Sequence, residues 1–300
     1  MILLALAGAW ADGWLDTMPN GRGGTLPPGM LLTPAAILIA VLAAGELAGL
    51  LRRAEILAST LLTCITAVMG LLVSAFLPDS FSGVSGGAVD SLAVASVLVG
   101  SMVYYGRHKN TDGMIAAAGG SLLAFCLLGL LLGYIVTLRR EYDIWIVIWV
   151  LLTTKSSDIG AYTLGSLIGR HKLIPWLSPG KTWEGLLGAV LFAAGIGVLG
   201  AMILSWAGIP KRPALVPAAL LGAVFAIAGQ AGDLLESVLK RDAGAKDSGG
   251  TIPGFGGVLD VIDSLLLAAP VAYWLLDIAA AECSQHGLTA HRKIPRASPS

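Results

Sequence analysis

Long apolar segments recur along almost the whole chain, separated by short polar loops. About 20 residues at 1.5 Å each cross the hydrocarbon core of a bilayer, and most of these segments have about that length. The pattern predicts an all-α integral membrane protein, a bundle of about eight or nine transmembrane helices in one domain over residues 1–300. The eight clear spans are expected near residues 34–51, 57–77, 88–105, 114–137, 144–165, 184–206, 214–236 and 258–280.

A shorter apolar stretch, from Met1 to Leu15, is a candidate for the ninth span. A signal peptide is the alternative, but such a peptide begins with a basic region that this stretch lacks, and Asp12 and Asp16 interrupt the apolar run. We therefore interpret it as a short or truncated first span.

The composition agrees with a membrane protein. Hydrophobic residues make up 56% of the chain and charged residues 13%, with a mean hydropathy of +0.80. The net charge is zero, so no overall basic character suggests a nucleic acid partner. Cys64, Cys126 and Cys283 show neither CxxC pairing nor metal-ligand spacing, and we interpret them as packing residues.

Basic residues are distributed unevenly between alternate loops. One set of loops carries ten and the other eight, a weak bias that provisionally assigns the first set to the cytoplasm. The loops at 166–183 and 237–257 both belong to that first set. They are therefore expected on the same side of the membrane, where they could form one site.

The most polar part of the chain, residues 229–263, is set between apolar segments. It holds nine charged residues in 35 positions, although charge is expensive near lipid. A chain that concentrates charge beside apolar helices usually does so for a site, so chemistry is expected here. The nine residues are Asp233, Glu236, Lys240, Arg241, Asp242, Lys246, Asp247, Asp260 and Asp263.

A second polar segment covers residues 153–185. Lys155 and Asp158 lie three residues apart, on one face of a predicted helix. They are either a buried ion pair or a pair facing a water-filled cavity, and we favour the cavity because intramembrane charges usually serve function. Gly180 and Lys181 precede a predicted helix N-terminus, where backbone amides, the helix dipole and the ammonium group could hold an anion.

The first part of the 229–263 segment is predicted to be helical. One residue follows another by four positions, and two more follow that second residue by three and four, which presents four polar side chains on one helix face. Glu236 and Lys240, at i and i+4, could also be an ordinary surface ion pair. The four residues of the polar face are Asp233, Ser237, Lys240 and Arg241.

The second part of the segment combines glycines with carboxylates. Residues 249–257 contain too many glycines for a helix, and these glycines permit the close backbone approach of a phosphate-binding nest. Asp260 and Asp263 project from one face of the following helix and could converge with Asp247 on Mg²⁺. Such a site is typical of metal-assisted phosphoryl or nucleotidyl transfer at a membrane surface.

These motifs resemble the C-terminal signature of the phosphatidate cytidylyltransferase (CDP-diacylglycerol synthase) family. The similarity extends upstream to the run GAYTLGSLIGRHKLIPWLSPGKTWEG and covers roughly residues 153–270. The matching signature reads Ser237-x-x-Lys240-Arg241-x4-Lys246-Asp247, followed by Pro253-Gly254-x-Gly256-Gly257-x-x-Asp260-x-x-Asp263.

The resemblance implies a reaction in which phosphatidic acid attacks the α-phosphorus of CTP, giving CDP-diacylglycerol and pyrophosphate. It also implies dependence on Mg²⁺, with a monovalent cation such as K⁺ as a further expectation. The loop charges provisionally place the site on the cytoplasmic side of the inner membrane, and a homodimer is an open expectation. By resemblance, Asp247, Asp260, Asp263, Lys240 and Lys246 are catalytic candidates. Asp233, Asp247, Asp260 and Asp263 are metal candidates, and Lys181, Ser237, Arg241, Gly256 and Gly257 are candidates for binding substrate phosphates.

Two positions depart from the family signature. Phe255 stands where the family has His, and Val261 where it has Arg, so two polar partners are missing. The carboxylates and the Lys-Arg pair remain, which favours an active enzyme. The alternatives are a relative that binds a lipid phosphate or nucleotide without this catalysis, and a transporter with Lys155 and Asp158 on its path, although no internal repeat typical of transporters is evident.

Overall fold

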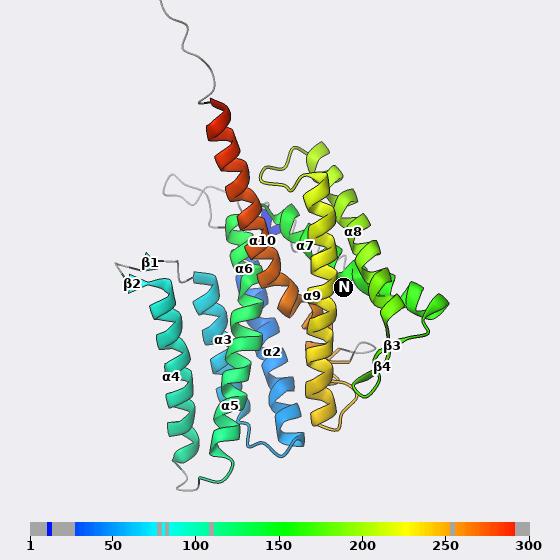
Figure 1. Cartoon of the computed structure of the whole chain (residues 1–300). Helices are drawn as coiled ribbons and strands as arrows, with labels where there is room; N and C mark the ends of the chain where they lie inside the picture. The colour runs from blue at the N-terminus through cyan, green and yellow to red at the C-terminus, as the bar shows by residue number, and fades with distance from the viewer. Residues whose placement is uncertain are drawn as a thin grey trace, which may run out of the picture.

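The long helices form one bundle in which α10 (Leu259–His291) lies between two groups (Figure 1). The group from α2 to α6 packs on one side of α10, and α7 and α9 pack on the other, with α8 outermost. This computed structural model describes residues 11–13, 28–76, 80–81, 84–107, 111–252 and 256–291.

Each of the eight predicted spans is a helix, so the all-α membrane fold is confirmed. Seven helices among the described residues are long and apolar enough to cross a membrane, and α3, with 17 residues, is a shorter apolar helix. The candidate ninth span lies outside the described residues, apart from residues 11–13. The helices of the eight clear spans are α2 (Leu32–Arg53), α3 (Thr60–Phe76), α4 (Gly86–Gly106), α5 (Met114–Ala124) with α6 (Leu132–Glu141), α7 (Ile144–Ile168), α8 (Trp183–Trp206), α9 (Leu215–Asp242) and α10.

The fourth span is continuous but irregular. A π-helical segment, η1 (Phe125–Leu131), joins α5 to α6. It lies where α3 comes closest, since a Cβ atom added to Gly129 would lie 2.7 Å from the Cα atom of Gly70. Small residues permit such backbone approach between membrane helices, and π-helical turns accommodate it by widening the helix locally.

A short antiparallel hairpin between α7 and α8 was not expected from the sequence. It consists of β3 (Lys172–Ile174) and β4 (Ser178–Thr182); a second hairpin pairs β1 (Ser80–Phe81) with β2 (Val84–Ser85). Thr182 ends β4 and caps α8, because its Oγ1 atom accepts a hydrogen bond from the Gly185 amide at 3.0 Å. The hairpin therefore holds the residue before this cap, Lys181, at the base of α8.

The loops at 166–183 and 237–257 lie at the same end of the bundle, as predicted (Figure 1). Arg241, at the end of α9, donates from Nε to the Leu177 carbonyl oxygen between β3 and β4, at 3.3 Å. This bond ties the hairpin to α9 and brings the two polar segments together.

A buried ion pair lies at the other end of the bundle, where α2 begins and α6 ends. Asp12 Oδ2 lies 2.6 Å from Arg139 Nε, and both side chains are almost fully buried. The other oxygen of Asp12 accepts hydrogen bonds from the amides of Leu31 and Leu32, at 2.9 and 3.3 Å. The carboxylate therefore neutralises a buried arginine and satisfies the first amides of α2.

We expect Asp12→Asn to destabilise the protein, because it removes a buried carboxylate charge that lies 2.6 Å from the Arg139 guanidinium. Breaking a buried ion pair costs about 3–5 kcal/mol, which corresponds to a fall in Tm on the order of 10 °C. Thermal unfolding in detergent measures the shift. Asp90→Asn, at an exposed position of α4, is the matched control, and an equal shift in both variants would contradict the role of the pair.

Candidate active site

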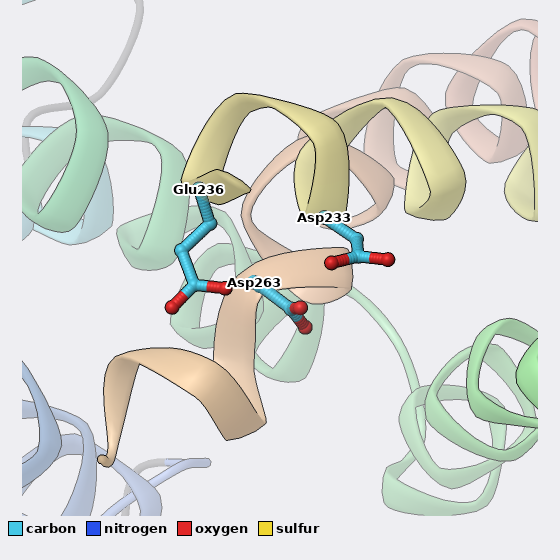
Figure 2. A group of neighbouring side chains, drawn as sticks. All are labelled: Asp233, Glu236 and Asp263. Atoms are coloured by element: carbon cyan, nitrogen blue, oxygen red, sulfur yellow. The ribbon is translucent and has the colours of Figure 1, made fainter. Parts of the chain in front are cut away.

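Three carboxylates from α9 and α10 meet below the surface of the bundle (Figure 2). The side chains of Asp233 and Glu236 project from the same face of α9, and that of Asp263 points toward them from α10. One oxygen atom from each lies within 4.8 Å of the others. We call these three residues the acidic triad.

The triad forms because α9 and α10 approach unusually closely. A Cβ atom at Gly232 would lie 3.3 Å from the Cα atom of Ser264 and would overlap the carbonyl group of Asp263. Gly229, one turn earlier, faces Ser264 as well. These small residues bring the backbones together, so that side chains as short as Asp233 and Asp263 can share one space.

Each carboxylate of the triad is paired with a different lysine. Lys181 of β4 lies 2.6 Å from Asp233, and Lys240 of α9 lies 2.7 Å from Glu236. The third lysine, Lys155 of α7, lies 3.3 Å from Asp263 and 3.9 Å from Asp158. The predicted Lys155–Asp158 pair therefore exists but is not isolated, because its lysine also contacts the triad.

Glu236 and Lys240 form the ion pair that their spacing allows, but the pair is not an ordinary surface one. The Glu236 side chain is only 1% exposed, and its Oε1 atom has no hydrogen-bond partner among the described residues. Burial of a carboxylate oxygen without a partner is costly, so a native structure that keeps one there calls for an explanation. A carboxylate oxygen that accepts no hydrogen bond from a described residue is available to coordinate a cation.

Asp260 lies outside the triad and fastens the glycine-rich loop. Its Oδ2 atom accepts hydrogen bonds from the amides of Ser248 and Gly257 at 3.0 and 2.7 Å, and from the Ser248 hydroxyl at 2.7 Å. Its Oδ1 atom pairs with Lys240 at 2.7 Å. Gly256 has φ +87°, and a Cβ atom there would lie 2.8 Å from Asp260, so this turn requires glycine.

A buried carboxylate from α2, Glu46, holds the beginning of α10. Glu46 accepts hydrogen bonds from the amides of Val258 and Leu259, both at 2.9 Å, and from the Ser248 hydroxyl at 3.2 Å. A carboxylate at these first amides is favoured by the helix dipole and satisfies donors that the helix cannot. Glu46 therefore fixes the position from which Asp260 and Asp263 project.

A cavity of about 300 Å³ opens beside the triad, between α7, α8 and α9. Its polar lining includes Asp158, Lys181, Gln230 and Asp233. The Gln230 side chain donates to Asp158 at 3.3 Å, and Lys181 also donates to the Gln230 carbonyl oxygen at 3.2 Å. Asp233 borders both the cavity and the triad, so a ligand in the cavity would reach the acidic group.

The remaining predicted site residues lie outside the acidic triad. Lys246 and Asp247 are exposed and make no hydrogen bond or ion pair with another described residue, and Ser237 is half-buried on α9. Of the two signature departures, Val261 is half-buried on α10, and Phe255 lies outside the described residues. The predicted roles of Asp247 and Asp260 in metal binding and of Gly256 and Gly257 in phosphate binding stay predictions, although the Gly257 amide already donates to Asp260.

Sequence reasoning assigned no role in the site to two carboxylates, Glu236 and Glu46. The signal for Glu236 was its position on α9, one turn from Asp233 and thus on nearly the same face. Glu46 had only weak evidence in the sequence, a carboxylate within an apolar span, because its partners lie more than 200 residues away.

The acidic triad fits a hard divalent cation. All three potential ligands are carboxylate oxygens, which suit Mg²⁺, Ca²⁺ or Mn²⁺ rather than softer metals. The buried, unsatisfied Oε1 atom of Glu236 gives the strongest reason to expect a ligand at this position. The residues that could hold the ion are therefore Asp233, Glu236 and Asp263.

Comparison with known proteins identifies the family of this chain. The cytidylyltransferase family matches residues 25–279, and the chain belongs to this family. Among individual relatives, the phosphatidate cytidylyltransferase of Bacillus subtilis is 30% identical over 247 residues, covering 81% of this chain and 88% of that protein.

Other relatives match over a shorter part. The phosphatidate cytidylyltransferase of Synechocystis is 42% identical over 144 residues, covering 48% of this chain and 44% of that protein. The uncharacterized protein YnbB of Escherichia coli is 43% identical over 136 residues, covering 44% of this chain and 42% of that protein. The matches to these two relatives thus cover less than half of their length.

We expect Glu46→Gln to loosen the start of α10, because an amide NH₂ group replaces one acceptor oxygen and the charge is lost. A hydrogen bond to a charged group contributes about 1.5–3 kcal/mol, so Tm falls by several degrees and amide exchange in residues 256–263 becomes faster. Hydrogen-exchange mass spectrometry measures the second effect. Glu55→Gln, at an exposed position just after α2, is the control; unchanged exchange in Glu46→Gln would contradict the proposed anchoring.

Proposed function

We propose that the protein is a phosphatidate cytidylyltransferase, which transfers CMP from CTP to phosphatidic acid and releases pyrophosphate. The observation that carries this proposal is the acidic triad with its three lysines, at one end of a membrane bundle that belongs to the cytidylyltransferase family. The relative from Bacillus subtilis, named a phosphatidate cytidylyltransferase, supports the choice of reaction.

The chemistry needs charge neutralisation and positioning more than proton transfer. The phosphate of phosphatidic acid is already ionised at neutral pH, so the attacking oxygen does not need a base. Mg²⁺ bound by Asp233, Glu236 and Asp263 would supply positive charge to the phosphates of CTP. Lys181, which borders the cavity, is positioned to add a second positive charge there.

The place of the site suits a reaction between a lipid and a nucleotide. The triad lies near the ends of α9 and α10 that adjoin the polar loops, so a phosphate at the membrane surface can reach it. A soluble nucleotide would enter from the same end, past the hairpin of β3 and β4. The weak excess of basic residues in these loops supports a cytoplasmic orientation in the inner membrane.

Purified protein in mixed micelles with labelled CTP, phosphatidic acid and Mg²⁺ should form a CDP-lipid and pyrophosphate. Asp263→Ala and Glu236→Gln should each lower the rate by roughly 10²–10³-fold, the scale typical of losing one group that stabilises the transition state. Asp277→Asn, at an exposed position further along α10, should keep the wild-type rate.

The alternatives predict different outcomes in the same assay. No CDP-lipid from correctly folded protein would refute the proposed reaction. Binding of CTP or phosphatidic acid without product would favour a non-catalytic relative, and product from a different lipid phosphate would favour an altered substrate.

The departures at Phe255 and Val261 generate a separate prediction. Because the triad and its lysines are present without them, we expect the double variant Phe255→His, Val261→Arg to raise kcat/KM by less than about tenfold, which corresponds to about 1.4 kcal/mol. Steady-state kinetics of both proteins test this. An inactive wild type with an active double variant would instead make the His and Arg essential.

A further inference from the structure

We propose that Lys155 and Lys181 are exchangeable counter-ions, which release the acidic triad when a divalent cation binds and then pair with substrate phosphates. The inference rests on the metal and the nucleotide of the proposed function, and assigns Lys155 a role in the same site. It begins from the observation that each triad carboxylate contacts its own lysine.

A divalent cation and these ammonium groups compete for the same oxygens. Lys181 lies 2.6 Å from Asp233 and Lys155 lies 3.3 Å from Asp263, so a cation bound by these carboxylates would stand close to both lysines. Like charges at such separations repel strongly in a partly buried site. Cation binding therefore favours movement of the lysines away from the carboxylates.

The lysines differ in how firmly they are held. Lys240 is anchored between two carboxylates, Glu236 and Asp260, each at 2.7 Å, and is expected to stay. Lys155 has only a longer second contact, 3.9 Å to Asp158, and its side chain is 35% exposed. The second contact of Lys181 is to a neutral group, the Gln230 carbonyl oxygen.

The cavity gives the released lysines a place to go. Asp158 and Lys181 both line it, so Lys155 would swing toward Asp158 at the cavity wall and Lys181 would turn from Asp233 within the same space. Flexible four-carbon stems allow such movement. Phosphates of the nucleotide would then meet two ammonium groups and the cation, so binding of cation and nucleotide would be mutually favourable.

The proposal predicts effects of opposite sign on two ligands. Lys155→Gln and Lys181→Gln should each bind Mn²⁺ alone more tightly, by roughly threefold, because a competitor for the carboxylates is gone. The same variants should bind the preformed Mn²⁺–CTP complex roughly threefold or more weakly, because a phosphate partner is gone. Electron paramagnetic resonance of free Mn²⁺ and calorimetry with Mn²⁺–CTP measure the two affinities without lipid substrate.

Lys172→Gln, at an exposed position of β3, controls for the loss of one positive charge at this end of the bundle. An equal increase in Mn²⁺ affinity in this control would overturn the proposed exchange and indicate a general electrostatic effect. Unchanged or weaker Mn²⁺ binding in both test variants would also overturn it. Lys155→Met and Lys181→Met repeat the test should a glutamine variant fail to fold, and wild-type protein that binds no Mn²⁺ would instead refute the metal site of the proposed function.

Discussion

The buried carboxylate of Glu46 holds the first amides of α10, and the geometry of the site depends on that contact. A helix that begins in a buried position has first amides that its own backbone cannot satisfy, and burial keeps out the water that would replace the missing bonds. Glu46 supplies the acceptors from α2, while Asp260 holds the preceding loop through Ser248 and Gly257. With α10 fixed in this way, Asp263 faces α9.

Charge pairing organises both ends of the bundle, with different consequences. At one end, Asp12 and Arg139 form a nearly fully buried pair that connects the described N-terminal residues to α6. At the other end, Asp233 and Lys181 line a cavity beside the buried Glu236, and one oxygen of Glu236 has no hydrogen-bond partner in the part of the chain that the structure describes. The first arrangement is satisfied and suits a structural role, whereas the second retains unused capacity for a ligand.

Close backbone contact is the second requirement of the site. Gly232 allows α9 to touch α10 at Asp263, so two short aspartates can approach one another. At the usual distance of 8–10 Å between helix axes, these short side chains would lie farther apart.

The sequence determined the helices, the family and the two polar segments, because hydrophobic length, helical periodicity and local signatures are properties of neighbouring residues. It also predicted that the loops at 166–183 and 237–257 share one end. Only the tertiary structure decided which charges meet. The spacing of Glu236 and Lys240 was compatible with a surface pair, but the fold buries the Glu236 side chain. Glu46 accepts a hydrogen bond from a residue more than 200 positions away in the sequence. Asp260 and Asp263 are neighbours on one helix, yet one fastens a loop and the other joins the triad. Which charged side chains contact one another depends on the packing of α2, α9 and α10, and no local sequence pattern specifies that packing.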